Sequence, residues 1–418
     1  MYIVITEQNG AFQVTEEVVT VVRIADFAIP SGITVSAFTA EGQILVGTGA
    51  GTYVAKSPGA NGLYLKYDSE AIGGVTADTP AVDIEDTTNH LYNGGFRLAE
   101  RQAPGTLTTI ANGGYSADRW KINRENADLQ YIRQDGSSES GLVSAYYGQF
   151  KKITNAGKFL LCQPLEYIDT LKFRGRALNF QLQMKASAAK TIKIAIVELQ
   201  AAGTADTLPT LVSSWNADST DPTLGANLVA IDTPVSCSVT TAWQTFQFTG
   251  TLPTTSKNIM VMVWTDADFA ANDTLSLAEA GLYLGTTLRS WTPRMLGQEL
   301  SLCQRYYVKT FSVDVLPAQN TDKLGMCLAM VGKAGASANV GWYLFPVVMR
   351  TTPITVTFFN PYAANAEARC VSAAADCTST AVWTVPTSQR EIAFTCTGPA
   401  GAAVGDTIAV HFTAEAEL

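Results

Sequence analysis

The chain has 418 residues, 47% of them hydrophobic and 16% charged, which is the composition of a globular protein with roughly two to four domains. Its net charge of −9 argues against a nucleic-acid partner, because a polyanion site needs clustered Lys or Arg and the sequence contains no such cluster. The N-terminus has no basic stretch ahead of an apolar one, and no apolar run approaches the ~20 residues of a membrane helix. We therefore expect a protein that is made and kept in the cytoplasm, without membrane insertion.

The first 85 residues are rich in turns and are predicted to form a small β segment. A hairpin is predicted between residues 2 and 22, turning at Asn9 and Gly10. A stretch punctuated by glycines follows at residues 41–62. A segment of this size cannot build a large core, so we expect partner chains to stabilise it.

Residues 86–298 carry the alternation of a β-sandwich. Apolar and polar residues alternate from 178 to 185, which predicts a strand with one face in the core and Asn179, Gln181 and Gln183 in solvent. The run at 259–264 is apolar on both faces, as in a central strand that is covered on each side. Turn clusters between such strands have the spacing of an all-β fold.

A short helix is predicted after Pro293. Leu296, Leu300, Cys303 and Tyr307 recur at spacings of four, three and four residues, which places them in one apolar stripe. We expect this helix to link the sandwich to the rest of the chain.

Residues 299–418 return to strand-like alternation and predict a C-terminal β-sandwich for oligomerisation and outward binding. His411 lies between Val410 and Phe412, so it is predicted to face away from them, toward solvent or another subunit. The seven cysteines of the chain are odd in number and dispersed, unlike a secreted disulfide framework. We expect mostly buried thiols.

Four motifs, in order, resemble those of bacteriophage tail-fibre and related virion proteins. Residues 42–65 (GQILVGTGAGTYVAKSPGANGLYL) are similar to a stretch near the virion-proximal part of such fibres. Residues 93–96 (NGGF) and 115–120 (YSADRW) resemble the opening of a carbohydrate-binding-module-like jelly roll, and residues 299–307 (ELSLCQRYY) resemble its end. Residues 345–353 (FPVVMRTTP) are similar to the strand that often follows.

The resemblance implies an all-β virion protein with an N-terminal anchoring segment (1–85), a central jelly-roll sandwich (86–298), a short linking helix and a C-terminal β-sandwich (299–418). It implies a non-enzymatic tail or collar fibre subunit, assembled in the host cytoplasm as a homo-oligomer, most simply a trimer. Anchoring to other virion proteins is assigned to residues of the first motif: Ile44, Leu45, Val46, Gly47, Gly49, Gly51 and Tyr53. Because the sequence has no long collagen-like or coiled-coil shaft, we expect any fibre to be short.

Aromatic residues are the candidates for binding a glycan of the host surface. Sugar rings present apolar C–H faces that stack on Trp and Tyr, while polar neighbours bind the hydroxyls. The candidates are Trp342, Tyr343, Tyr362, Trp383 and Trp215, with core or subunit-interface positions as the alternative. Trp120, Trp243, Trp264 and Trp291 lie in motifs or strand patterns and are assigned to the framework.

A calcium site is a further candidate, and no other cofactor is expected. Asp266, Asp268 and Asp273 follow the predicted central strand and offer oxygen ligands of the kind that Ca²⁺ binds. The spacing is not that of an EF-hand, and a solvated acidic turn is the alternative.

Enzymatic machinery is not evident in the sequence. With only two histidines, His90 and His411, most zinc sites and His-dependent triads are disfavoured. A polysaccharide depolymerase or esterase with a cleft at a subunit interface remains an alternative function, as does a head-decoration or collar protein that stabilises the particle. A soluble bacterial glycan-binding module is disfavoured by the missing secretion signal.

Overall fold

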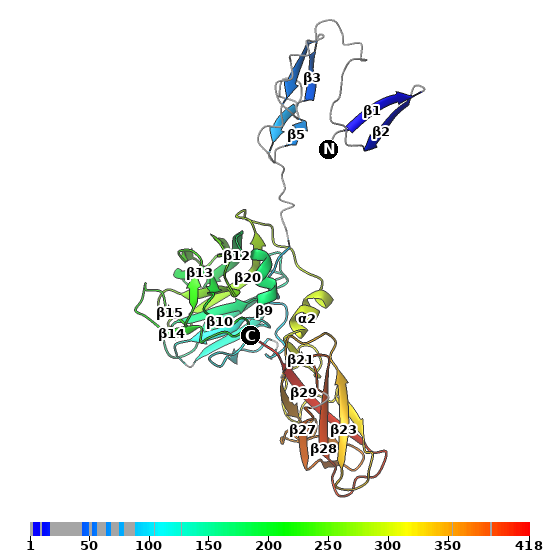
Figure 1. The fold of residues 1–418 in the computed structure, drawn as a ribbon. Helices are drawn as coiled ribbons and strands as arrows, with labels where there is room; N and C mark the ends of the chain where they lie inside the picture. Colours follow the sequence, from blue (N-terminus) through cyan, green and yellow to red (C-terminus); the bar gives the residue numbers. More distant parts are fainter. Residues whose placement is uncertain are drawn as a thin grey trace. The chain divides into compact units, whose positions relative to one another are not determined.

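The structure is a computed structural model that describes residues 88–418, apart from residues 104, 127, 353, 385 and 386, together with the backbone of six strands nearer the N-terminus. It consists almost entirely of antiparallel sheets with a few short helices, which confirms the predicted all-β class (Figure 1). Its contacts divide the chain between residues 85 and 86 into two units, which we describe separately. Within the described residues no helix is long and apolar enough to cross a membrane.

The N-terminal unit contains three antiparallel strand pairs. They are β1 (Ile3–Gln8) with β2 (Ala11–Glu16), β3 (Ile44–Gly49) with β4 (Thr52–Lys56), and β5 (Tyr64–Tyr67) with β6 (Val75–Asp78). The first pair is the predicted hairpin, since Gln8 is the partner of Ala11. Of the predicted anchoring residues, Ile44, Leu45, Val46, Gly47 and Gly49 lie on β3 and Tyr53 lies on β4, whereas Gly51 falls outside the described residues.

The central sandwich consists of two packed sheets. The first contains, in spatial order, β18 (Gln244–Thr251), β12 (Ala177–Ala186), β20 (Thr274–Leu284), β10 (Tyr146–Lys152), β9 (Leu129–Asp135) and β7 (Thr108–Thr109). The second contains β16 (Leu228–Ala230), β13 (Lys190–Leu199), β19 (Asn258–Thr265), β11 (Phe159–Pro164) and β8 (Lys121–Arg124), and β17 (Val235–Val239) also pairs with β13. The connections include α1 (Tyr167–Thr170), the 3₁₀ helix η2 (Leu171–Phe173) and the pair β14 (Val212–Ser214) with β15 (Thr223–Leu224).

The pattern of apolar and polar residues along each strand accounts for its place in this core. Every residue of β19 is buried and the strand pairs with β11 and β13 on its two edges, so it is the predicted central strand. On β12 the apolar residues enter the core as predicted. The prediction that Asn179 and Gln181 lie in solvent is wrong, because residues 285–291 cross over this face of the sheet and bury both side chains.

The two parts of the motif that resembles a jelly-roll opening, residues 93–96 and 115–120, meet in the core. Trp120 is fully buried, stacks on Phe96 with 5.0 Å between ring centroids, and donates its indole N–H to the carbonyl oxygen of Asn93 at 3.1 Å. Asp118 and Arg119, in the same motif, are also buried. These motif residues therefore hold the framework of the sandwich together.

The C-terminal sandwich is built around β29 (Thr407–Glu415). This strand pairs with β21 (Tyr307–Lys309), β22 (Cys327–Met330), β24 (Thr355–Phe359) and β25 (Arg369–Cys370), the last of which pairs with β26 (Ala375–Asp376). A second sheet has the order β23 (Ala338–Leu344), β28 (Glu391–Thr397) and β27 (Ser379–Val382). All seven cysteines of the chain are buried free thiols, as expected, and four of them lie in this core.

Two local predictions need correction in this region. The predicted helix is present as α2 (Leu296–Gln304), but Leu296 is exposed and the buried positions are Cys303 and Glu299, whose carboxylate accepts a hydrogen bond from the backbone N–H of Asn93 at 2.5 Å. His411 does not face solvent. It is fully buried, stacks on Phe311 with 4.0 Å between ring centroids and contacts the Thr310 hydroxyl, because β29 is covered on both faces.

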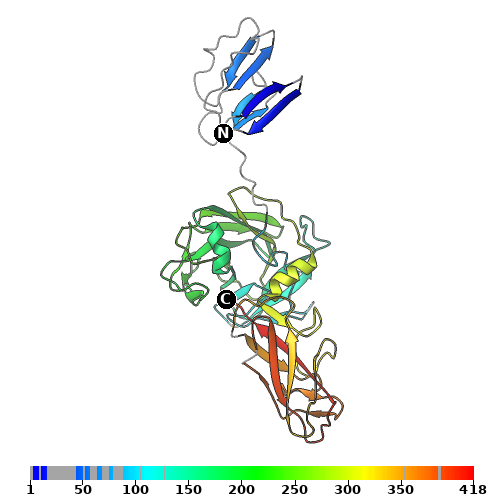
Figure 2. The ribbon, with the colours of Figure 1, turned by 45° about the vertical axis from the view of Figure 1, so that its right-hand side comes forward.

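Ion pairs join the two sandwiches, and both views place the C-terminus at their junction (Figure 1 and Figure 2). Glu417 binds Arg119 and also Arg101, the latter at 2.9 Å. Burial alone would raise the pKa of Glu417, but the two guanidinium groups hold it below its ordinary value. A second pair joins Glu166 to Arg305, with two contacts of 2.6 and 2.8 Å.

Asp118, next to this junction, should give the protein a distinctive pH dependence. Burial raises its pKa from 3.8 to about 6, so the folded state holds the proton more tightly than the unfolded chain does. The resulting stabilisation is present at low pH and is lost as pH rises through about 6. Between about pH 4 and pH 7 the free energy of unfolding of Asp118→Asn should therefore rise relative to wild type, by up to about 3 kcal/mol.

Denaturant unfolding over this pH range measures the effect. Asp232→Asn, at an exposed position, is the matched control and should follow the wild-type profile. If the Asp118→Asn and wild-type profiles run parallel, Asp118 does not titrate as its burial requires.

Candidate functional site

Residues 285–295, which we call the strap, cross the outer face of the first sheet of the central sandwich. The amide of Gln181 donates to the carbonyl oxygen of Arg289 at 2.6 Å and accepts from its N–H at 2.8 Å. Asn179 and Gln247 donate to the carbonyl oxygens of Thr287 and Thr286 at 2.8 and 2.6 Å. Side-chain amides of the sheet thus fix the strap through its backbone, and two hollows lie beside it.

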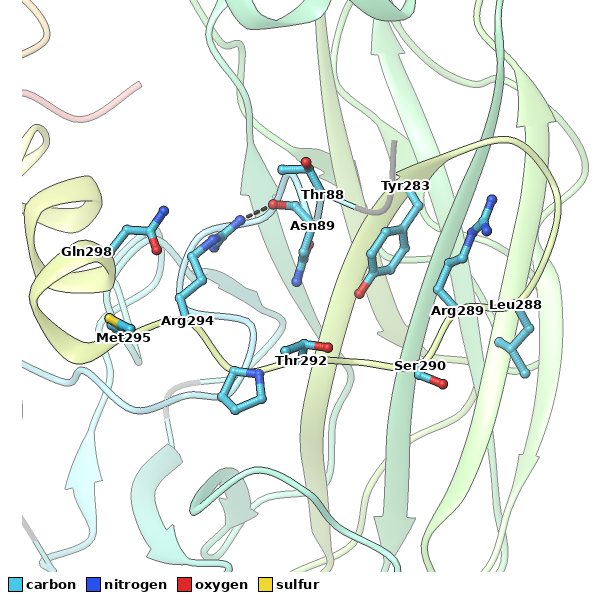
Figure 3. Close-up of a pocket in the computed structure, with 11 residues that line it drawn as sticks. Thr88, Asn89, Tyr283, Leu288, Arg289, Ser290, Thr292, Arg294, Met295 and Gln298 are labelled. Atoms are coloured by element: carbon cyan, nitrogen blue, oxygen red, sulfur yellow. Dashed lines mark hydrogen bonds between the residues drawn. The ribbon is translucent and has the colours of Figure 1, made fainter. Parts of the chain in front are cut away.

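The larger hollow has a volume of about 770 Å³. Figure 3 shows its lining: Thr88, Asn89, Tyr283, Leu288, Arg289, Ser290, Thr292, Pro293, Arg294, Met295 and Gln298. Arg294 is held in place because its guanidinium donates to the carbonyl oxygens of Asn89 and Leu91, the latter at 2.6 Å.

Tyr283 forms the aromatic part of this lining. Its ring lies over Gly281, two residues earlier on β20, where a Cβ atom would come within 2.4 Å of a ring carbon. Only glycine leaves room for the ring to lie there. Burial raises the pKa of Tyr283 to about 12, so its hydroxyl stays neutral and can donate a hydrogen bond.

The smaller hollow, of about 220 Å³, contains a carboxylate and an indole. Glu279 lies at an irregularity in the pairing of β20 with β12 and has a φ of 54°, a conformation that costs a non-glycine residue about 1–3 kcal/mol. Its carboxylate accepts from the amides of Val143 and Ser144 and from the side chain of Gln183 at 2.7 Å. Trp291 lines the same hollow, and its buried indole N–H has no hydrogen-bond partner.

We call the two hollows and the strap segment 288–290 that they share the β20 cleft. Its lining combines hydrogen-bond donors and acceptors with aromatic rings, which suits a neutral ligand rich in hydroxyl groups. Of the lining residues only Glu279 carries a carboxylate, whereas hydrolysis of a glycosidic bond ordinarily uses two. A third pocket contains Glu100 and Asp118, but its volume is only about 50 Å³.

The candidate aromatics predicted from sequence are divided among several places. Trp342 and Trp383 lie together on the C-terminal sandwich, 50% and 40% exposed, with ring centroids 6.0 Å apart. Tyr343 follows Trp342 on the same strand and therefore points to the opposite face, where it packs against Phe412.

The other two aromatic candidates lie elsewhere. Tyr362 follows β24 and lies beneath Lys323, whose ammonium nitrogen is 4.4 Å from the ring centroid. Trp215 is half-buried against the core of the central sandwich. The structure thus brings two of the five candidates together and separates the other three.

The three aspartates of the candidate calcium site do not converge. Asp273 pairs with Lys190, and Asp266 lies 3.6 Å from Lys193. Asp268 is exposed, and its backbone N–H is 3.3 Å from the carboxylate of Asp218. Within the described part of the chain no group of three or more His, Cys, Asp or Glu side chains could hold a metal ion.

Sequence reasoning missed Glu279, Tyr283 and Arg289 and assigned Trp291 to the framework. One signal was present: the outward positions of β12 carry Asn179, Gln181 and Gln183, which are amides rather than the charged residues of an ordinary solvated face. The position of the strap above them could not be derived from local pattern.

These features define the class as an all-β protein in which a central sandwich with a polar cleft is joined to a smaller sandwich. No family model matches the sequence, and no curated protein matches it. Several solved structures are similar to about half of the chain. One is a family 61 carbohydrate-binding module in complex with β-1,4-galactotriose, at 14% identity over 47% of this chain and 99% of that chain, with a TM-score of 0.29.

Two further structures are similar over comparable lengths. The enzymatically active domain of tailspike protein 4 of bacteriophage CBA120 matches at 9% identity over 47% of this chain and 21% of that chain, with a TM-score of 0.30. The C-terminal family 22 carbohydrate-binding module of a xylanase from Clostridium thermocellum matches at 12% identity over 44% of this chain and 98% of that chain, with a TM-score of 0.27.

Proposed function

We propose that this chain is a non-enzymatic subunit of a bacteriophage virion, in a tail or collar fibre, and that it contributes to host attachment by binding surface glycan. In this proposal it assembles in the host cytoplasm as a homo-oligomer, most simply a trimer, and residues 1–85 attach it to other virion proteins. Several weak glycan sites in one oligomer act together through their high effective concentration.

The virion part of the proposal rests on the four motifs, which occur in the expected order over about three quarters of the sequence. The motif residues of the central sandwich support a fold, since Trp120 and Phe96 belong to its core. These motif residues therefore support the proposed class of protein, but they do not identify its ligand.

The observation that carries the glycan part is the β20 cleft. Arg289, Glu279 and Gln183 provide donors and acceptors for hydroxyl groups, and Trp291 provides aromatic surface beside them, whereas Tyr283 is almost completely covered. The strained backbone of Glu279 supports a binding role, because strain and strand irregularities concentrate where a side chain must be aimed. Trp342 fits a glycan less well, since the groove that it lines is mostly apolar, and Trp383 lies beside it.

Replacing Glu279 by glutamine tests the glycan site. Loss of the charge weakens hydrogen bonds to ligand hydroxyls, so binding to an array of bacterial-surface oligosaccharides should fall by about tenfold or more. Glu391→Gln, on the C-terminal sandwich, is the matched control and should bind as wild type does. Equal binding by Glu279→Gln and wild type, with both proteins folded, would place the glycan elsewhere.

Adsorption competition tests the attachment role. Purified full-length protein at saturating concentration should block adsorption of the phage to its host cells, and the Glu279→Gln variant should block it less. Unchanged adsorption would contradict the attachment role and favour a subunit that reinforces a collar or head. Release of reducing ends from host polysaccharide by the purified protein would contradict the non-enzymatic part.

A further inference from the structure

The C-terminal sandwich exposes large apolar side chains on the outer side of two neighbouring strands. Leu328 and Met330 of β22 and Trp342 and Leu344 of β23 are alternate residues that face outward. Together with Trp383, which follows β27, they are 58%, 68%, 50%, 72% and 40% exposed in that order. We call these five residues the apolar face.

The apolar face is continuous. A groove of about 540 Å³ lies along β22 and β23, and the Thr407 hydroxyl and the Trp342 indole N–H are the hydrogen-bonding side-chain groups among its lining residues. On the far side of β23, Trp342 and Trp383 flank Ala393 of β28, which is completely covered. The surface therefore extends from β22 across β23 to the end of β27.

This surface is poorly suited to the ligands considered so far. A sugar needs hydrogen-bonding groups that converge beside the aromatic ring, and a polyanion needs Lys or Arg. The residues that line the groove carry neither a charge nor an amide side chain. Its chemistry instead matches another apolar protein surface.

Its size fits a stable protein interface. The five side chains together expose on the order of 500 Å². Soluble monomers rarely expose more than a few hundred Å² in one apolar patch, and a standard interface buries about 800 Å² on each partner. The apolar face would thus supply the greater part of one such interface.

We propose that the apolar face is the surface through which copies of this chain associate. Interfaces between permanently associated copies are more apolar than transient ones, which resemble the rest of the surface. The chain carries a net charge of −9, so close-range repulsion between copies is least where uncharged surfaces face each other. The proposal rests on the homo-oligomeric part of the proposed function and is independent of its glycan and virion parts.

Sedimentation velocity of the full-length chain over a range of concentrations tests the proposal. Wild type should sediment as an oligomer, and Met330→Glu combined with Leu344→Glu should raise the dissociation constant at least about 30-fold, because association would bury unpaired charges. Both positions are about 70% exposed, so the variant should keep the wild-type melting behaviour. Ile168→Glu, at a 64% exposed apolar position of the central sandwich, is the matched control and should remain oligomeric.

The outcomes separate this proposal from glycan binding. A wild-type protein that is monomeric, or a folded double variant that stays oligomeric, overturns the apolar face as the self-association surface, whatever the chain binds. A variant that dissociates but keeps the wild-type affinity of each single glycan site supports both proposals. Dissociation of the variant in a protein that binds no glycan supports this proposal and contradicts the other.

Discussion

Replacing Arg119 by methionine should lower the free energy of unfolding by about 3–5 kcal/mol, the ordinary cost of removing one partner of a buried ion pair. The Arg119 side chain is completely buried and binds Glu417, donates to the carbonyl oxygen of Pro164 at 2.7 Å, and stacks on Tyr306 with its central carbon 3.4 Å from the ring centroid. Methionine keeps most of the volume but leaves the Glu417 carboxylate with less compensation for its burial.

Thermal and denaturant unfolding measure this change. The exposed Arg390→Met is the matched control and should change stability by less than about 0.5 kcal/mol. Adding Glu417→Gln to Arg119→Met should restore part of the loss, because the carboxylate that lacks compensation is then removed as well. A single variant as stable as wild type would mean that the pair does not hold the two sandwiches together.

Replacing Trp120 by alanine should cost about 3–5 kcal/mol, which is typical of removing a large buried aromatic side chain. The indole fills the space beside Phe96 and donates to the carbonyl oxygen of Asn93, so its removal leaves a cavity and takes from that oxygen one of its two hydrogen bonds, the other coming from the Phe96 N–H. Unfolding followed by circular dichroism measures the loss.

Trp120→Phe provides the matched control for the cavity. Phenylalanine keeps an aromatic ring against Phe96 and loses the hydrogen bond to Asn93, so it should cost clearly less than alanine. If the alanine variant lost no more stability than the phenylalanine variant, the core around Trp120 would be able to close around the missing ring.

Much of the fold could be predicted from sequence because it depends on local periodicity. Alternation on β12 and the doubly apolar run of β19 each correspond to one packing environment along one strand. The separation of Trp342 from Tyr343 follows from the same rule, since neighbouring residues of a strand point to opposite faces.

The candidate site could not be predicted because it depends on segments distant in sequence. Gln181 meets Arg289 only after β12 and β20 have paired, and the conformation of Glu279 results from an irregularity in that pairing. His411 was misplaced for a related reason: its environment is set by Phe311, which is 100 residues earlier in the chain (311 against 411). The alternation of apolar and polar residues predicts which residues share a face of a strand, but it does not predict which segment covers that face.

The junction between the sandwiches has a mechanical consequence. The chain leaves the central sandwich through α2 and β21, and after β29 it returns to it through Glu417. The non-covalent connection through Glu417 resists bending at the linker, so the two sandwiches should move as one rigid unit. In an assembly of copies joined at the apolar face, each β20 cleft would then keep a fixed distance and angle to the next one. This geometry would determine which spacing of host glycans several clefts can bind at the same time.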